Sequence, residues 1–400
     1  MNAAYEASFG LSFVNAEMSG GASALRIAGS RIDAVDTVPA RYDRVIDLHG
    51  DRILPGLINA HDHLQLNNFG RLKFRDRHAN VREWIDDIRT SKQTNRSLRA
   101  SAGCPLDQRL MLGGIKNLLS GVTTVAHHDP LYQFLTNETF PVRVVGRYGW
   151  SHSLLIDGEE RVRTSYQHTP ASWPWIIHAG EGLDNEAGAE FNRLGVLGCI
   201  GANTLLVHGV ALDRVQKELL VAVKAGLVWC PSSNLHLFGL TADVSMLIPH
   251  AQVALGSDSR LSGGRDLLGE LAVAREIGGY DERTLESLVT TNGARLLRLP
   301  DRGTLRADAA ADILVLPSQL PLSRASRADI RLVMIKGRML YADLHYAAAI
   351  APASQWVEVR VDGRPKALDR TLAMQLAQLD SQLNIREPGL EVPQAEWRAA

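Results

Sequence analysis

Cysteine is scarce in this 400-residue chain, which holds only Cys104, Cys199 and Cys230, spaced far apart. An odd number of widely spaced thiols provides neither a disulfide framework nor the paired spacing of a cysteine zinc site. The sequence therefore predicts a protein of a reducing compartment.

Long hydrophobic runs and an excess of one charge are also lacking. No uncharged apolar stretch reaches the roughly 18 residues that a membrane helix needs. Residues 1–6 have neither the basic start nor the apolar core of a secretory signal. The 43 Lys and Arg residues are balanced by 44 Asp and Glu residues, which argues against a nucleic-acid or membrane surface. We expect a soluble cytoplasmic protein with neither kind of partner.

What the chain does have is enough apolar material for a large core. Hydrophobic residues make up 45% of it, and its 34 glycines and 16 prolines are typical of a globular protein. An α/β barrel takes about 250 residues, so a chain of 400 residues has room for a barrel and a second domain.

Between residues 53 and 302, short apolar runs alternate with helical patterns that end at a glycine, such as Gly121 and Gly226. This order is typical of βα units around a parallel sheet. Seven runs indicate strands and residues 162–167 indicate an eighth, which favours a (β/α)8 TIM barrel. The seven runs are 53–58, 122–126, 142–145, 175–177, 204–207, 227–229 and 253–255.

The two ends of the chain have a different pattern of short strands and turns. We expect residues 1–52 and 303–345 to pair into one composite β-sandwich beside the barrel of residues 53–302. Residues 346–400 are predicted to add a C-terminal extension with one strand, which alternates valines, and one helix.

Side chains that bind metals or carry protons recur where the predicted strands end. In a barrel, the carboxyl ends of the strands carry the active site. Histidines two positions apart on a strand point to the same side, as two ligands of one metal require. Each pattern alone is weak, but their joint recurrence predicts one site. The residues are His61, His63, His178, Glu181, His208 and Asp258.

Together these motifs resemble the amidohydrolase superfamily. The CPxSN pattern that begins at Cys230, combined with the HxxE of His178 and Glu181, is most similar to its aminohydrolase branch of aromatic deaminases and triazine hydrolases. The matching segments are Leu54–His63, Gly121–Val125, His178–Glu181, Cys230–Leu235, Leu255–Ser259, Thr291–Arg295 and Ala309–Leu316.

The resemblance implies a barrel with a small β-sandwich, often in a homo-oligomer, and one divalent metal with water in the remaining position. Imidazole and carboxylate ligands suit Zn²⁺, or else Fe²⁺. Binuclear members use a modified lysine on a central strand, and no lysine occurs between Lys116 and Lys217, which favours one ion. The implied ligands are His61, His63, His178 and Asp258.

The resemblance also implies catalytic roles. Asp258 takes a proton as the metal-activated water attacks, Glu181 protonates a ring nitrogen, and His208 polarises or orients the attacked carbon. Gln65 and His152 are candidate substrate contacts. The segment from His152 to His178 is shorter than the family pattern, which predicts a differently built pocket.

His127 and His128 end the second predicted strand, and a supporting place near the metal is one interpretation of them. The alternative is that they are ordinary polar loop residues without a role at the metal site.

The leading hypothesis is a metal-dependent deaminase that releases ammonia from a purine, pterin, pyrimidine or triazine. The alternative is a hydrolase that opens a cyclic amide such as an imidazolone. A barrel that only binds a ligand is a third possibility, against which Glu181 argues, because a binding protein has no use for a proton shuttle.

Overall fold

The structure, a computed structural model, describes residues 10–383 and 386–393. Residues 1–6, which lack the pattern of a secretory signal, and the predicted domain ends at residues 1 and 400 lie outside the described part. The chain divides into a β-rich unit of Met1–Leu57, Leu118–Thr123 and Asp301–Ala400, and an α/β unit of Ile58–Asn117 and Thr124–Pro300.

The β-rich unit contains two sheets, and both ends of the chain contribute to them. One sheet has the order β3-β2-β1-β4 and the other β19-β17-β18-β16-β15-β14-β5. One hydrophobic core holds buried side chains of both sheets, among them Phe13 and Met334. The strands are β1 (Leu11–Val14), β2 (Leu25–Ala28), β3 (Arg31–Val35), β4 (Arg44–Asp47), β5 (Arg52–Pro55), β14 (Ile313–Leu316), β15 (Leu332–Ile335), β16 (Arg338–Ala342), β17 (Trp356–Val361), β18 (Arg364–Asp369) and β19 (Leu390–Glu391).

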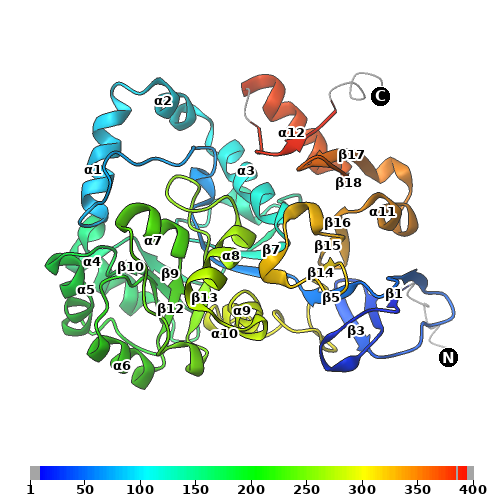
Figure 1. The fold of residues 1–400 in the computed structure, drawn as a ribbon, viewed down its shortest axis with the longest axis horizontal. Helices are drawn as coiled ribbons and strands as arrows, with labels where there is room; N and C mark the ends of the chain where they lie inside the picture. Colours follow the sequence, from blue (N-terminus) through cyan, green and yellow to red (C-terminus); the bar gives the residue numbers. More distant parts are fainter. Residues whose placement is uncertain (1–9, 384–385, 394–400) are drawn as a thin grey trace, which may run out of the picture. The chain divides into compact units, whose positions relative to one another are not determined.

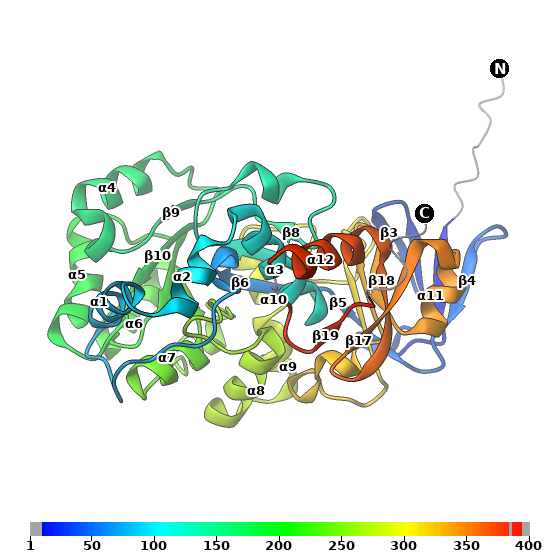
Figure 2. The same ribbon diagram turned by 90° about the horizontal axis from the view of Figure 1, so that it is seen from above.

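The predicted C-terminal strand and helix are present as β17 and as α12 (Arg370–Leu383). The strand continues through a hairpin into β18, and the two residues of its turn, Asp362 and Gly363, have φ of 49° and 77°. Two left-handed residues of this kind form the tight turn that suits the twist of a hairpin. The helices α11 (Leu344–Ile350) and α12 pack on these strands (Figure 2).

The α/β unit is built on eight strands, which form two sheets with the orders β6-β7-β8 and β9-β10-β11-β12-β13. All neighbours in the second sheet pair in parallel. The prediction of a strand at residues 162–167 was wrong, since they lie in a helix, and Gly149–Ser151 supply a strand instead. The strands are β6 (Leu57–Asp62), β7 (Val122–His127), β8 (Arg143–Val144), β9 (Gly149–Ser151), β10 (Trp175–Ala179), β11 (Thr204–His208), β12 (Gly226–Trp229) and β13 (Val253–Leu255).

Helices follow most of these strands, and α4, α5 and α6 lie outside the sheet of β9–β13 (Figure 1). Their first turns are fixed by side-chain caps, since Ser153, Asp184 and Asp213 each accept a hydrogen bond from a backbone N–H three residues on. The helices are α1 (Val81–Lys92), α2 (Arg96–Gly103), α3 (Leu106–Leu119), α4 (Leu154–His168), α5 (Asn185–Val196), α6 (Arg214–Val223), α7 (Pro231–Phe238), α8 (Leu267–Gly278), α9 (Glu282–Leu288) and α10 (Thr291–Leu296).

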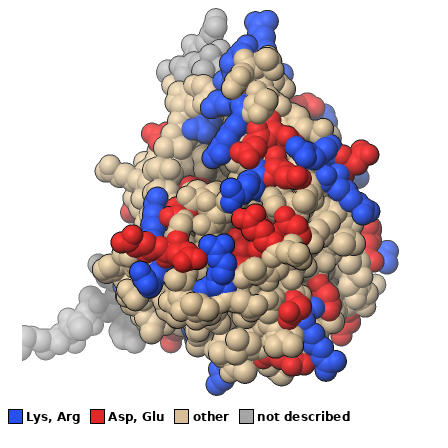
Figure 3. Space-filling view, turned by 90° about the vertical axis from the view of Figure 1, so that its left-hand side faces the viewer, with Lys and Arg blue, Asp and Glu red and all other residues tan. Residues whose placement is uncertain are grey.

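Neither a membrane-spanning helix among the described residues nor a patch of one charge on the face drawn in Figure 3 is found. None of the helices in residues 10–383 and 386–393 is both long and apolar enough to cross a membrane. On the face drawn in Figure 3, basic and acidic side chains are interspersed.

Candidate metal centre and active site

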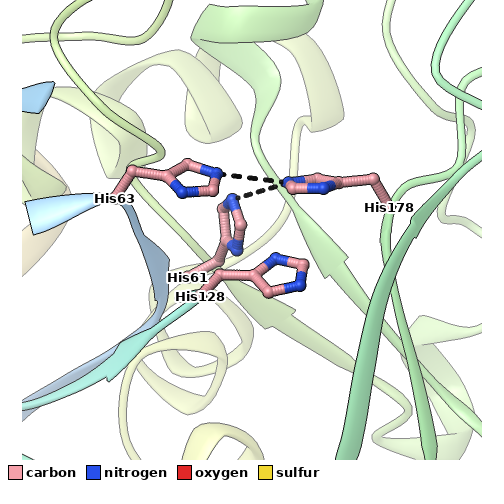
Figure 4. Close-up of side chains that lie close together, drawn as sticks. All are labelled: His61, His63, His128 and His178. Carbon is pink, nitrogen blue, oxygen red and sulfur yellow. Dashed lines mark hydrogen bonds between the residues drawn. The ribbon is translucent and has the colours of Figure 1, made fainter. Parts of the chain in front are cut away.

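Three histidine rings point at one another at the ends of β6 and β10. Nε2 of His178 lies 3.3 Å from Nε2 of His63 and 3.3 Å from Nε2 of His61 (Figure 4). All three side chains are buried. Because residues 61 and 63 are two positions apart in extended backbone, their rings reach the same side of the strand. The structure therefore brings together the three predicted histidine ligands.

Hydrogen bonds at the opposite ring nitrogens orient two of these histidines. Nδ1 of His63 lies 3.0 Å from Oδ2 of Asp129, and Nδ1 of His178 donates to the carbonyl of His152 over 2.8 Å. These partners place a proton on Nδ1, so that in the neutral ring each Nε2 keeps its lone pair. Lone pairs that face each other at 3.3 Å require a proton or a metal cation between them. Three converging imidazoles are a donor set that suits Zn²⁺.

His128, at the end of β7, is the fourth histidine of this cluster. Its ligand nitrogen and those of His61, His63 and His178 all lie within 4.8 Å of one another. Nε2 of His128 donates to the carbonyl of Ser151 over 2.8 Å, whereas its Nδ1 is buried without a hydrogen-bond partner. Burial holds the pKa of His128 well below its usual value, so the ring is neutral. The structure thus places His128 within the cluster, whereas the sequence suggested at most a supporting place.

Asp258 is the predicted carboxylate ligand, and the structure places it beside two of the histidines. Its Oδ1 lies 3.7 Å from Nε2 of His61 and 4.0 Å from Nε2 of His63. Its Oδ2 accepts hydrogen bonds from the hydroxyls of Ser233 and Ser262, each 2.8 Å long. Burial by itself would raise the pKa of Asp258, but the neighbouring histidines, His61 first, hold it well below its usual range. The carboxylate is therefore ionised.

Glu181 and His208 form a second pair at the same site. Oε1 of Glu181 lies 3.4 Å from Nε2 of His208, and Nδ1 of His208 donates to Oδ1 of Asn234 over 2.9 Å. Burial lowers the pKa of His208 to about 4, so its Nε2 is an acceptor at neutral pH. Burial, with Asp258 and Glu190 adding to it, raises the pKa of Glu181 well above its usual value. The pair therefore offers a protonated carboxyl next to an acceptor nitrogen.

The backbone at two of these residues is unusual. His208 has a φ of 75° and Asp258 a φ of 49°, both in the left-handed region that non-glycine residues rarely adopt. Strained residues of this kind cluster at functional sites, because a surrounding structure has to hold them in place.

Asp129 is a central residue of the site that the sequence analysis missed. Besides His63, its carboxylate accepts from Nε2 of Gln65 over 2.6 Å and lies 3.5 Å from Nε2 of His152. Burial alone would raise its pKa, but His152 and His63 outweigh it and keep Asp129 ionised. The signal was present, because Asp129 directly follows two histidines at the end of β7. Gln65 and His152, the predicted substrate contacts, both interact with Asp129.

A cavity of about 260 Å³ lies beside these groups in the α/β unit. The predicted site residues His63, His178, Glu181, His208 and Asp258 all line it. The remaining lining residues are Gln65, Leu66, Val81, Trp84, Ile85, Ile88, Arg89, Asp129, His152, Ser153, Ile156, Ser259, Leu261 and Ser262.

Comparison with known proteins agrees with the motifs. Residues 167–340 match the model of the amidohydrolase family. A curated relative, the 5-methylthioadenosine/S-adenosylhomocysteine deaminase of Haloquadratum walsbyi, is 25% identical over 70% of this chain and 74% of its own length. The predicted resemblance to the amidohydrolase superfamily and its aminohydrolase branch is confirmed.

Two solved structures share the fold. The triazine hydrolase from Arthrobacter aurescens superimposes with a TM-score of 0.69 at 17% identity, covering 86% of this chain and 100% of that one. An adenosine deaminase from Xanthomonas campestris, with bound zinc, has a TM-score of 0.67 at 17% identity and covers 87% of this chain and 97% of that one. This chain therefore has their α/β architecture with an additional small β domain.

Proposed function

We propose that this protein is a metal-dependent hydrolase that deaminates an aminated heterocycle. The observation that carries the proposal is the convergence of three Nε2 atoms, from His61, His63 and His178, next to the buried pair of Glu181 and His208. Two of the three similar proteins named above are deaminases, which agrees with this reaction class. A ring amine and water would give a ring carbonyl and ammonia.

In this proposal His61, His63 and His178 hold one divalent ion, with Asp258 as the fourth protein ligand. We favour Zn²⁺, which a neighbouring structure carries, over Fe²⁺. The ion would supply a strong nucleophile at neutral pH by lowering the pKa of water towards about 7. Asp129 keeps the Nε2 lone pair of His63 aimed at the ion through its contact with Nδ1.

Glu181 and Asp258 would move the protons. Asp258, ionised and next to the histidines, accepts a proton from the attacking water. Glu181, whose carboxyl is held protonated by burial, donates to a ring nitrogen, so that the C–O bond forms as charge develops there. The amine would then leave as ammonia with the proton that Asp258 took from water, and the hydroxyl proton on the attacked carbon would return to Glu181 as the carbonyl forms. In this proposal Nε2 of His208 accepts a hydrogen bond from the carboxyl of Glu181 and so orients it. Of the two predicted roles of His208 we therefore favour orientation over polarisation of the substrate.

Further parts of the prediction also stand as proposals. We propose that the eight strands of the α/β unit close into a barrel, that residues 1–52 with 303–345 form one domain and 53–302 the other, and that 346–400 extend the first of them. A cytoplasmic homo-oligomer with a small heterocycle as its substrate completes the proposal.

The test combines metal analysis with a substrate screen. Purified protein should carry about one Zn²⁺ or Fe²⁺ per chain, and a panel of aminated heterocycles should identify one that releases ammonia. Glu181→Gln should keep the metal and lose turnover by about 100-fold or more, the scale of a general acid–base group. Glu160→Gln, at an exposed position on α4, is the matched control and should be fully active.

Three outcomes would contradict the proposal. A product with an opened ring and no free ammonia would identify the cyclic-amide hydrolase. Tight binding of a heterocycle by the metal-loaded protein with no turnover at all would identify a binding protein. Full activity of metal-free protein would remove the metal from the mechanism.

A further inference from the structure

The first turn of α1 is attached to the loop that carries Glu181. The backbone N–H of Val81 donates to the carbonyl of Glu181 over 3.1 Å, and the N–H of Leu183 donates to the carbonyl of Ala79 over 2.7 Å. Between them, Gly182 approaches Asn80 so closely that an added Cβ would lie 2.7 Å from its side chain. The start of α1 is therefore held beside the proposed catalytic acid.

One face of α1 is apolar, and it lines the cavity. Val81, Trp84, Ile85 and Ile88 follow the i, i+3, i+4, i+7 spacing of a single helical face, and all four line the cavity. The indole of Trp84 is fixed by its N–H, which donates to the carbonyl of Leu72 over 3.1 Å. The other apolar lining residues are Leu66, Ile156 and Leu261. The part of the cavity next to α1 is thus an apolar subsite.

Most polar groups that line the cavity outside the histidine cluster already have partners. Oε1 of Gln65 is buried without one, but its amide is held beside Asp129 and not on the apolar face of α1. The carboxylate of Asp129 is occupied by Gln65, His63 and His152. The hydroxyl of Ser153 accepts from the first turn of α4, and the exposed Arg89 lies 3.2 Å from Asp86. A buried diol needs acceptors for its hydroxyl protons, and burial without them is costly.

We propose that this subsite selects aminated heterocycles whose ring carries an uncharged apolar substituent, and that it disfavours rings that carry a sugar. The substituent lies against Ile85 and Ile88 while the ring lies against Glu181. The proposal rests on the proposed function, because it takes the reacting ring to lie at the histidine cluster. This substrate preference would differ from that of the curated relatives, which are named as deaminases of nucleosides.

The experiment uses substituents of matched size on the same ring. Aminopurine, aminopyrimidine and aminotriazine are each prepared with a pentyl or a 2,3-dihydroxypropyl group, which have equal numbers of non-hydrogen atoms, and adenosine is added as a nucleoside. Ammonia release gives kcat/KM for each pair, and calorimetry with the metal-loaded protein gives Kd. We expect the pentyl compound to be favoured by about tenfold or more in both quantities on any ring that is accepted.

Two variants assign this preference to α1. Ile88→Ser places a hydroxyl in the apolar face and should reduce the pentyl preference at least threefold, mainly through KM. Ile277→Ser is the matched control, because Ile277 is 44% exposed on α8 and does not line the cavity. It should leave the preference unchanged.

The two proposals fail in different ways. If ammonia is released equally from pentyl, dihydroxypropyl and ribosyl compounds, the reaction stands and the apolar subsite is overturned. The same holds if Ile88→Ser and Ile277→Ser change the preference equally. If no compound releases ammonia, the deaminase proposal fails, and the ratio of Kd values then decides the subsite: a tenfold pentyl preference supports it and equal values overturn it.

Discussion

Lys116 offers a test of how the metal centre is supported from behind. This lysine on α3 is fully buried, and its Nζ lies 3.1 Å from Oδ2 of Asp62, which is also fully buried. It donates to the side chains of Asn67 and Ser257 over 2.8 and 2.9 Å, and to the carbonyl of Asp258 over 2.9 Å. Asp62 stands between His61 and His63 at the end of β6, so the lysine connects β6 to the loop that follows β13.

Lys116→Met removes the charge and keeps most of the volume. The loss of one partner from a buried ion pair costs about 3–5 kcal/mol, because the other charge stays buried without compensation. Here Asp62 retains amide donors from Asn67 and Asn117, each at 2.8 Å. We therefore expect the lower end, about 3 kcal/mol, which corresponds to a fall in Tm of roughly 6–12 °C for a unit of this size.

Urea unfolding of the metal-loaded protein measures this loss. Lys217→Met is the control, since its partner Asp243 has a side chain that is 65% exposed and stays solvated when the lysine is lost, so we expect a cost of about 1 kcal/mol. The double variant Asp62→Asn/Lys116→Met should be about 1–2 kcal/mol more stable than Lys116→Met alone, because no charge is left unpaired. A Lys116→Met variant as stable as the control, or a double variant with additive losses, would refute this reasoning.

Three further changes probe the site and its surroundings. Asp129→Asn should weaken metal binding about 10- to 100-fold, measured by competition with a chelator, because it disturbs the contact that orients His63. Turnover should fall as pH rises through the raised pKa of Glu181, since only its protonated form donates, and a flat pH profile would exclude that role. Burial raises the pKa of Glu270 to about 7, because the buried carboxyl favours its neutral form. The stability that this neutral carboxyl contributes is therefore complete below about pH 4.5 and is lost as the pH rises through about 7. Glu270→Gln should therefore reduce the loss of unfolding free energy between pH 5 and pH 8 by roughly 3 kcal/mol, and an unchanged loss would count against the assignment.

Local patterns determined much of the site in advance. His61 and His63 alternate on a strand, and that geometry is the same in any sheet, so their common direction was readable from spacing alone. The composition indicated a large core, the alternation of apolar runs with helical patterns indicated an α/β fold, and the motifs indicated the superfamily. The apolar face of α1 was also present as helical spacing in the sequence.

The predicted strand at 162–167 shows where local pattern fails. This segment is rich in residues that also suit strands, yet it is part of α4, which begins at the cap of Ser153. Val162 is buried, and the ring of Tyr166 packs against Trp175 with centroids 5.0 Å apart. These contacts with distant residues favour the helix, and propensity alone does not contain them.

Only the tertiary structure decided which groups share protons and lone pairs. The contact of Asp129 with His63 joins residues 66 positions apart, and the 3.4 Å separation of Glu181 from His208 depends on the pairing of β10 with β11. The pKa values of Glu181 and His208 then follow from burial, which no sequence spacing encodes. The sequence therefore determined the kinds of side chain present, whereas the packing of the strands determined their distances and desolvation, and hence their protonation.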